Sequence, residues 1–478
     1  MYSGDFESQK LSILKNVYGF QSFRTGQEQV VDSLLAGENT LAVMPTGSGK
    51  SLCFQIPSLM LGGLTIVVSP LVALMQDQVA ALRLNGVAAE TINSGRDRRD
   101  NITSWKKVKA GFTQILYMAP ERLMSERMLI ALRELPIKLF AIDEAHCISQ
   151  WGPSFRPEYE QLKRLGTLFP GLPIAALTAT ADKATREDIV DQLFNKKATV
   201  VVTGFDRPNI KLNVAGKDDW RRQMLSFLRT KKGDSGIIYC LSRKKTDDTA
   251  AFLIENGYVA LPYHAGLEKS QREKNQDLFM TQEGVVMVAT IAFGMGIDKP
   301  DIRFVLHADL PSSIEAYYQE IGRAGRDGLP SETLLIYGLD DLVLRRRMIE
   351  EGDADQEFKF RENKRLDYLL SYCETPDCRR KLLLNYFDDK IDTCNNCDNC
   401  FDPPKLIDGT ELAQKLLSTI FQTGQYFGQV HVINVIRGLK EKNITEPIGK
   451  KPVNTGRITP SGTDVPRSQK KRKKKKRK

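Results

Sequence analysis

The sequence predicts an α/β protein with two lobes, each built around a parallel sheet, followed by a helical module that carries a cluster of cysteines. From residue 39 to residue 310, short apolar runs rich in β-branched residues alternate with turns and with charged helical stretches. The runs form two sets, separated by a joint at residues 203–208, and five of the eight cysteines follow between Cys373 and Cys400. Alternation of this kind is typical of βαβ units, so we expect parallel sheets.

The apolar runs give the expected strands. Those of the first set are residues 40–44, 64–68, 114–118, 139–142 and 174–177, and those of the second set are residues 236–240, 285–289, 302–306 and 333–337. Polar or glycine-bearing turns follow the runs of the first set, which favours strands of one sheet. The chain becomes helical and charged over residues 339–386, and helical periodicity returns at residues 408–439.

The composition indicates a soluble, globular protein. With 478 residues, 41% of them hydrophobic, the chain has room for about three domains. The best apolar candidate for a membrane span, residues 59–68, is interrupted by Gly62 and Gly63 and is shorter than the roughly 18 residues required. Residues 1–10 are polar and acidic where a secretory signal has an apolar core. We therefore expect a cytoplasmic protein without a membrane partner.

The net charge of +10 comes from the end of the chain. Ten of the 69 Lys and Arg residues lie between Arg467 and Lys478, and the remaining 59 equal the acidic residues in number. Charge alone therefore says little about the folded part, where any surface for nucleic acid has to be a local patch.

A glycine-rich segment after the first expected strand has the pattern of a phosphate-binding loop. It consists of Thr46, Gly47, Ser48, Gly49, Lys50 and Ser51. Glycines let backbone N–H groups surround phosphates at a helix N-terminus, while Lys50 supplies a positive charge and Ser51 a magnesium ligand. Met44 stands where the strict pattern has its first glycine, and the alternative is an ordinary loop that happens to read GSGKS.

An acidic pair strengthens the hypothesis of a nucleotide site. The apolar run 139–142 ends in Asp143 and Glu144, which places two carboxylates at the carboxyl edge of a strand. Asp143 would hold magnesium, and Glu144 would orient and deprotonate the attacking water. An isolated Asp-Glu pair is usually a solvated turn, but a position about 90 residues after a phosphate loop favours the catalytic interpretation.

Four cysteines have the spacing of a zinc site. The pattern C-x15-C-x2-C-x2-C is formed by Cys378, Cys394, Cys397 and Cys400. Four thiolates close a tetrahedral site with no position left for water, so we expect structural Zn²⁺; an iron–sulfur cluster is the rival, disfavoured by the spacing. Cys373 is interpreted as a bystander. The remaining cysteines lie in apolar stretches, as small buried residues do: Cys53, Cys147 and Cys240.

Further segments join these sites in an order that resembles the motifs of superfamily 2 helicases. They are residues 20–27 (FQSFRTGQ), 69–71 (SPL), 119–122 (APER) and 178–180 (TAT). Residues 145–159, which begin AHCISQWG and end FRPEY, resemble the aromatic-rich loop of the RecQ family. The match is close to the bacterial members, covers roughly residues 11–439, and is specific because several motifs occur in the right order. It implies that both lobes are RecA-like.

The resemblance implies that ATP is the preferred nucleotide. By the family pattern Phe20 would stack on adenine, and Arg24 and Gln27 would hydrogen-bond to the edge of the base. The alternative is a loop aromatic that packs into the core while its polar neighbours are solvated.

The second lobe resembles the late helicase motifs at residues 289–303 and 319–328. In that comparison Arg323 and Arg326 would reach across the cleft between the lobes to the γ-phosphate. Gly296 and Asp298 would also lie near the nucleotide. Closure and reopening of the cleft with each ATP would turn hydrolysis into stepping along DNA.

The aromatic-rich loop is interpreted as a contact for DNA. Its candidate residues are Trp151, Phe155, Arg156 and Tyr159. Aromatic faces beside a guanidinium suit stacking on unpaired bases next to a phosphate, whereas packing inside the lobe is the alternative, and for Tyr159 the sequence favours neither. Pro153 and Ser154 stand where relatives usually carry His-Asp, which puts the coupling of the ATPase to DNA in question.

The C-terminal part departs from the family pattern. Residues 406–443 resemble the opening helices of the family's winged-helix domain, whose later part normally grips duplex DNA. From Pro447 onward the sequence is rich in Gly, Pro, Ser, Thr and basic residues, without apolar periodicity. We expect a disordered basic tail there, either a natural arm or the product of a shifted reading frame.

These patterns together predict five segments. They are a first RecA-like lobe that binds ATP (1–205), a second RecA-like lobe (206–338), a helical zinc-binding module (339–405), a partial winged-helix segment (406–446) and a disordered basic tail (447–478).

The resemblance implies an ATP-dependent DNA helicase that uses ATP, Mg²⁺ and Zn²⁺, moves 3′ to 5′ and acts in recombination, repair and the SOS response. Expected partners are single-stranded and partially duplex DNA and a single-stranded-DNA-binding protein, and the expected state is a monomer associated with the nucleoid. The rival hypothesis is a DNA-binding ATPase or scaffold whose unwinding is impaired because the winged helix is incomplete.

Overall fold

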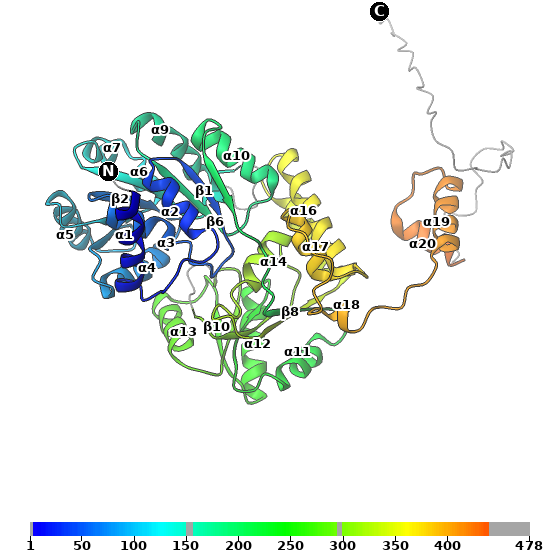
Figure 1. Ribbon diagram of the computed structural model, residues 1–478. Helices are drawn as coiled ribbons and strands as arrows, with labels where there is room; N and C mark the ends of the chain where they lie inside the picture. The colour runs from blue at the N-terminus through cyan, green and yellow to red at the C-terminus, as the bar shows by residue number, and fades with distance from the viewer. Residues whose placement is uncertain (1–2, 150–155, 294–298, 439–478) are drawn as a thin grey trace, which may run out of the picture. The chain divides into compact units, whose positions relative to one another are not determined.

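A computed structural model describes residues 3–149, 156–293 and 299–438. The chain forms two compact units, Met1–Pro404 and Lys405–Lys478. The first unit contains two parallel sheets and the helices that cover and follow them (Figure 1). The predicted α/β architecture of two parallel-sheet lobes with a helical module after them is therefore confirmed.

Seven parallel strands form the first sheet within the described residues. They are β1 (Thr40–Val43), β2 (Leu64–Val68), β3 (Ala89–Ile92), β4 (Ile115–Met118), β5 (Ile137–Ile142), β6 (Ile174–Thr178) and β7 (Thr199–Val202). Their order is β3-β4-β2-β5-β6-β1-β7. Only β6 lies between β1 and β5, so the segments that follow these two strands emerge close together at the carboxyl edge of the sheet.

Helices and short 3-10 turns accompany the first sheet. They are α1 (Ser3–Asn16), α2 (Gln27–Leu35), α3 (Leu52–Met60), α4 (Val72–Leu84), α5 (Arg98–Lys109), α6 (Pro120–Leu123), α7 (Glu126–Leu132), η1 (Ala145–Ile148), α8 (Pro157–Glu160), η2 (Gln161–Arg164), α9 (Leu165–Leu168) and α10 (Lys183–Phe194). Along β1, Leu41 and Val43 join one buried cluster and Ala42 joins another, because successive side chains point to opposite faces. Burial on both faces explains why this strand is a continuous apolar run.

The second sheet has six parallel strands in the described part of the chain. They are β8 (Ile210–Gly216), β9 (Ser235–Tyr239), β10 (Val259–Tyr263), β11 (Val285–Ala289), β12 (Ile302–His307) and β13 (Ser331–Tyr337), in the order β10-β11-β9-β12-β13-β8. Its helices are α11 (Trp220–Arg229), α12 (Arg243–Glu255), α13 (Lys269–Thr281) and α14 (Ile314–Ile321).

The helical module after the second sheet contacts both lobes. Its helices are α15 (Leu339–Glu351), α16 (Gln356–Glu374), α17 (Arg379–Tyr386) and α18 (Asp398–Phe401). Tyr372 in α16 lies 3.1 Å, hydroxyl to hydroxyl, from Tyr317 in α14. Asp388, just after α17, accepts a 2.6 Å hydrogen bond from Arg186 in α10 of the first lobe. The module therefore fixes a contact with each lobe.

The second unit contains two described helices, α19 (Thr410–Gln422) and α20 (Gln429–Ile436), which pack against each other. The expected tail at residues 447–478 lies outside the described residues. Among the residues that the structure does describe, no helix combines the length and the apolar character needed to cross a membrane.

The close packing of β9 generates a test of the fold. A Cβ atom on Gly236 would lie 2.2 Å from Cζ of Phe304 in β12, so Gly236→Ala should lower the free energy of unfolding by about 1–3 kcal/mol through overpacking. Gly166→Ala in α9 is the control, because a Cβ there meets nothing within 4 Å and alanine favours a helix. The measurement is the midpoint of urea unfolding, which should be lower for Gly236→Ala than for Gly166→Ala. Equal midpoints for the two variants would contradict this packing.

Candidate nucleotide site and zinc centre

The predicted phosphate loop connects β1 to α3, as a phosphate-binding loop requires. Gly47 and Gly49 have φ angles of +83° and +79°, a backbone conformation that glycine adopts without strain. The Lys50 ammonium donates to the carbonyl oxygens of Met44 at 3.0 Å and Pro45 at 3.3 Å. Burial lowers the pKa of Lys50, while the carboxylates of Glu144 and Asp143 act in the opposite direction. The lysine therefore lies inside the loop, beside the acidic pair.

Met44 does not disturb the loop, although the strict pattern has glycine at this position. Its side chain is fully buried, with its sulfur 3.7 Å from Sγ of Cys53, and its N–H donates to Thr178 at 3.0 Å. Met44 thus extends β1 and belongs to the core. The glycines that the loop needs are those further along.

The acidic pair lies at the carboxyl edge of the sheet, as predicted. Asp143 follows β5 and donates its N–H to the carbonyl of Val68 at 2.9 Å. Burial and the neighbouring Glu144 raise the pKa of Asp143 to about 7. Burial would also raise the pKa of Glu144, but His146, Lys50 and Arg323 outweigh it and hold that pKa below its usual value. Glu144 is therefore the carboxylate of the pair that is held in its ionised form.

Glu144 is fixed by its backbone and by a polar network. Its φ of +50° is left-handed, which is uncommon for a residue other than glycine and typical of functional sites. Its carboxylate lies 3.3 Å from Nδ1 of His146, which is 2.9 Å from Oγ1 of Thr178. The hydroxyl of Thr178 donates to the carbonyl of Thr180, whose own hydroxyl accepts from Gln319 in α14 at 2.9 Å. The network thus runs from the acidic pair to the second lobe.

Ser51 has a partner that the sequence analysis did not single out. The side-chain amide of Gln78 in α4 donates to Oγ of Ser51 at 3.3 Å, and Tyr117 in β4 donates to Oε1 of Gln78 at 2.8 Å. Gln78 therefore orients the hydroxyl that is predicted to bind magnesium. Its place in the helix after the Ser-Pro-Leu segment is the only sequence signal for it.

Two of the three predicted adenine-binding residues, Arg24 and Gln27, contact the phosphate loop. Phe20 is 47% exposed, which excludes the alternative of an aromatic packed into the core. Arg24 donates to the carbonyl of Gly47, and Gln27 donates to the carbonyl of Ser48 at 2.8 Å. The polar neighbours of Phe20 are therefore not simply solvated, because they hold the loop.

The second lobe brings its two predicted arginines to this site. Both lie in the turn after α14, and Arg323 is only 8% exposed. A Cβ atom on Gly47 would lie 3.2 Å from Cγ of Arg326, so this arginine packs on the phosphate loop of the first lobe. Gly296 and Asp298 lie outside the described residues.

Arg207 is a residue of the site that the sequence analysis missed. It lies in the joint between β7 and β8, and its guanidinium donates to the carbonyl of Thr46 at 3.0 Å. The same group donates to three carbonyls of the turn after α14, those of Gly322, Ala324 and Gly325, at 3.1, 2.8 and 2.9 Å. All four acceptors are backbone atoms, so no pattern of side chains reveals this contact.

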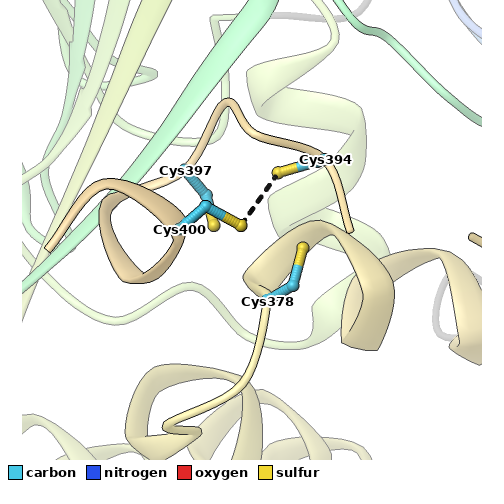
Figure 2. A group of neighbouring side chains, drawn as sticks. All are labelled: Cys378, Cys394, Cys397 and Cys400. Atoms are coloured by element: carbon cyan, nitrogen blue, oxygen red, sulfur yellow. Dashed lines mark hydrogen bonds between the residues drawn. The ribbon is translucent and has the colours of Figure 1, made fainter. Parts of the chain in front are cut away.

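The four predicted zinc ligands come together in the helical module (Figure 2). Their sulfur atoms all lie within 4.8 Å of one another, and Sγ of Cys394 is 3.9 Å from Sγ of Cys400. A tetrahedral zinc with Zn–S bonds of about 2.3 Å would place its ligands roughly 3.8 Å apart, so the set fits Zn²⁺. Cys373 is buried and is not a member of this set.

Comparison with known proteins places the whole first unit in one family. The models that match are DEAD/DEAH box helicase (residues 24–189), helicase conserved C-terminal domain (218–328), RecQ zinc-binding (339–401) and RQC domain (403–451). The chain is 47% identical over 438 residues to the ATP-dependent DNA helicase RecQ of Haemophilus influenzae, covering 91% of this chain and 70% of that protein. The chain belongs to the RecQ family.

A second relative agrees with this assignment, and a solved structure shares the fold. The RecQ protein of Bacillus subtilis is 41% identical over 438 residues, which cover 91% of this chain and 74% of that protein. The helicase Lhr of Mycobacterium smegmatis, solved with ssDNA and AMP-PNP, has a TM-score of 0.56 at 18% identity, over 76% of this chain and 57% of that one. The latter similarity concerns the fold alone.

The aromatic-rich loop that resembles the RecQ family is described only at its two ends, residues 145–149 and 156–159. Trp151 and Phe155, with Pro153 and Ser154 between them, lie outside the described residues. Arg156 is partly exposed and donates to the carbonyl of Pro70 at 3.3 Å.

Tyr159 was predicted as one of the DNA contacts of this loop, with packing as an equal alternative, and the structure favours packing. Its side chain is completely buried, and its hydroxyl donates to the backbone carbonyl of Asp143 at 3.1 Å. A ring without exposed surface cannot stack on a base. We therefore interpret Tyr159 as a support for the acidic pair.

A basic groove of about 1050 Å³ opens at the carboxyl edge of the first sheet. It lies between the segments that follow β2, β3 and β4, the helix α5 and the start of α7. Its basic lining residues are Arg96, Arg98, Lys106, Lys109, Arg122 and Arg127. The groove is a local concentration of positive charge, which the charge balance of the whole chain could not locate.

The zinc centre generates a test by metal analysis. Wild-type protein should contain one Zn per chain, and Cys397→Ser should lose it, because a neutral hydroxyl replaces one of four thiolates. Cys373→Ser is the matched control, since Cys373 is buried nearby but lies outside the ligand set. Zinc that is retained in Cys397→Ser, or lost equally from both variants, would contradict the assignment of the ligands.

Proposed function

We propose that this chain is an ATP-dependent DNA helicase that couples ATP hydrolysis to 3′ to 5′ movement on single-stranded DNA and to unwinding of duplexes. The decisive observation is that Lys50, the acidic pair and the turn with Arg323 and Arg326 converge on one phosphate loop from two lobes. The two RecQ relatives described above are named as ATP-dependent DNA helicases, which supports the same activity.

The residues of the site divide the chemistry among them. Lys50 and the backbone N–H groups of the loop would bind the phosphates, and Ser51 with Asp143 would hold Mg²⁺, which neutralises phosphate charge. Glu144, which His146, Lys50 and Arg323 hold in its ionised form, would position the attacking water and accept its proton. Arg323 and Arg326 would stabilise the charge that develops on the γ-phosphate.

The remaining nucleotide contacts read the base. The exposed ring of Phe20 would stack on adenine. Arg24 and Gln27, which donate to loop carbonyls in this structure, would exchange some of these bonds for contacts with the base. Gly296 and Asp298 would complete the site from the second lobe.

The basic groove is the proposed path of the DNA strand on the first lobe. Its arginines and lysines can neutralise backbone phosphates without reading sequence. Arg156 would contact the strand at this groove, because it donates to the carbonyl of Pro70, which lines the groove. Trp151 and Phe155, which lie outside the described residues, would stack on bases.

The proposal extends to the domain limits, the cellular process and the partners of the protein. We propose the lobes at residues 1–205 and 206–338, the zinc module at 339–405, a winged-helix segment at 406–446 and a basic tail at 447–478. The protein would act in recombination and repair as a nucleoid-associated monomer, with a single-stranded-DNA-binding protein as a further partner. The alternative, a DNA-binding ATPase or scaffold with impaired unwinding, is not favoured, since the RecQ relatives are named as ATP-dependent DNA helicases.

Hydrolysis is tested with two variants. Lys50→Ala should abolish ATP binding and hydrolysis because it removes the charge that faces the phosphates, whereas Glu144→Gln should bind ATP but lose roughly 100-fold or more in kcat. A fluorescent ATP analogue reports binding, and release of phosphate reports turnover. Normal turnover by Glu144→Gln would exclude Glu144 as the proton acceptor.

Unwinding is tested on a partial duplex with a 3′ overhang, with and without ATP. Wild type should separate the strands only with ATP, and the double variant Arg122→Ala/Arg127→Ala should bind DNA more weakly, with a salt dependence flatter by about one phosphate contact for each residue. Arg229→Ala, on α11 of the second lobe and outside the groove, is the control. An unchanged salt slope in the double variant would remove the groove from the DNA path.

A further inference from the structure

The contact made by Arg207 has a consequence for catalysis that rests on the proposed function. Its four acceptors divide between the lobes: the carbonyl of Thr46 belongs to the phosphate loop, and the other three belong to the turn that carries Arg323 and Arg326. One guanidinium thus bridges the phosphate loop and the turn that carries the two arginines, and so fixes the distance between them.

Arg207 is partly buried among other positively charged side chains, which repel its guanidinium. Burial lowers the pKa of Arg207, and Arg326, Arg24 and Arg380 add positive charge around it. Even so, a guanidinium stays protonated in proteins, so its donors must find acceptors. Backbone carbonyls from both lobes provide them, and losing Arg207 would leave several of these carbonyls without a partner.

The zinc module fixes the backbone of Arg207 from the other side. Arg380 in α17 donates to the backbone carbonyls of Arg207 and Ile210, and it forms an ion pair with Asp206 at 2.6 Å. The helix α17 begins directly after the zinc ligand Cys378. Asn396, between two further ligands, donates to the carbonyl of Pro208 at 2.8 Å. Both parts of the zinc centre therefore hold the joint.

We propose that Arg207 is a positioning residue for ATP hydrolysis, which sets Arg323 and Arg326 against the phosphate loop and is itself held by the zinc module through Arg380. An arginine is required because two of its nitrogen atoms each donate to two acceptors. A lysine carries the same charge on a single nitrogen and cannot span these positions.

The first experiment measures hydrolysis by the full-length, zinc-loaded protein. Arg207→Lys should lower kcat for ATP about 100-fold, since a displacement of about 1 Å at a reacting centre has an effect of this size, and it should change the Kd for ATP by less than about threefold. One Zn per chain should remain, which excludes general unfolding of the module.

A double-mutant cycle then separates positioning from stability. If Arg207 acts through the turn, Arg207→Lys should reduce kcat by less than about threefold when Arg326→Ala is already present. A merely structural role would give multiplicative losses. Arg380→Gln removes the contact of the zinc module with the backbone of Arg207, so it should cause a smaller loss of kcat. This variant replaces Arg207→Lys in the experiment if Arg207→Lys does not fold.

The matched control is Arg186→Ala. Arg186 also joins the first lobe to the helical module, through Asp388 and the carbonyl of Phe387, but it contacts neither the phosphate loop nor the turn. Its kcat should stay near that of wild type. A kcat for Arg207→Lys within about threefold of wild type, or multiplicative losses in the cycle, would overturn the inference alone. A wild type without ATPase activity would overturn the proposed function itself.

Discussion

The nucleotide site depends on one constraint of backbone chemistry. A loop that turns its N–H groups toward a phosphate has to turn its carbonyls outward, and buried carbonyls need donors. Every carbonyl from residue 44 to residue 49 accepts a side-chain hydrogen bond. The donors are Lys50 for Met44 and Pro45, Arg207 for Thr46, Arg24 for Gly47, and Gln27 for Ser48 and Gly49. The shape of the loop is thus set by its own Lys50 and by residues from two other segments, one of them the joint between the lobes.

The sequence predicted the central strands well because their signal is burial on two faces. Residues 285–289 were expected as a strand and are β11. The strands that escaped prediction are β3, β7, β8 and β10. In β10, Pro262 argues against a strand, yet a strand at the edge of the sheet tolerates it. In β3, Glu90 interrupts the apolar run, but it is buried and paired with Lys107 at 2.8 Å. Such compensation comes from distant residues and leaves no local trace.

The same distinction separates the site residues that could be predicted from those that could not. Lys50, Asp143 and the zinc cysteines belong to patterns of residue type at fixed spacing, because their chemistry requires particular side chains. Arg207 escaped because its acceptors are backbone carbonyls more than 100 residues away in either direction. Tyr159 illustrates an alternative that the sequence left open. An aromatic next to a functional loop has the composition of a binding residue, and only its complete burial shows that it packs.

The order of strands in the second sheet affects how the chain can be made. The strand β8 opens this lobe in sequence, yet in the sheet it pairs with β13 and occupies the edge beside it. A ribosome therefore has to add the intervening residues 217–330 before β8 meets its partner. Until then the strand presents unpaired backbone groups, the feature that invites association between chains. The bridge between Leu212 in β8 and Cys397 lies later still. The lobe is therefore completed in the cell only when the zinc module emerges.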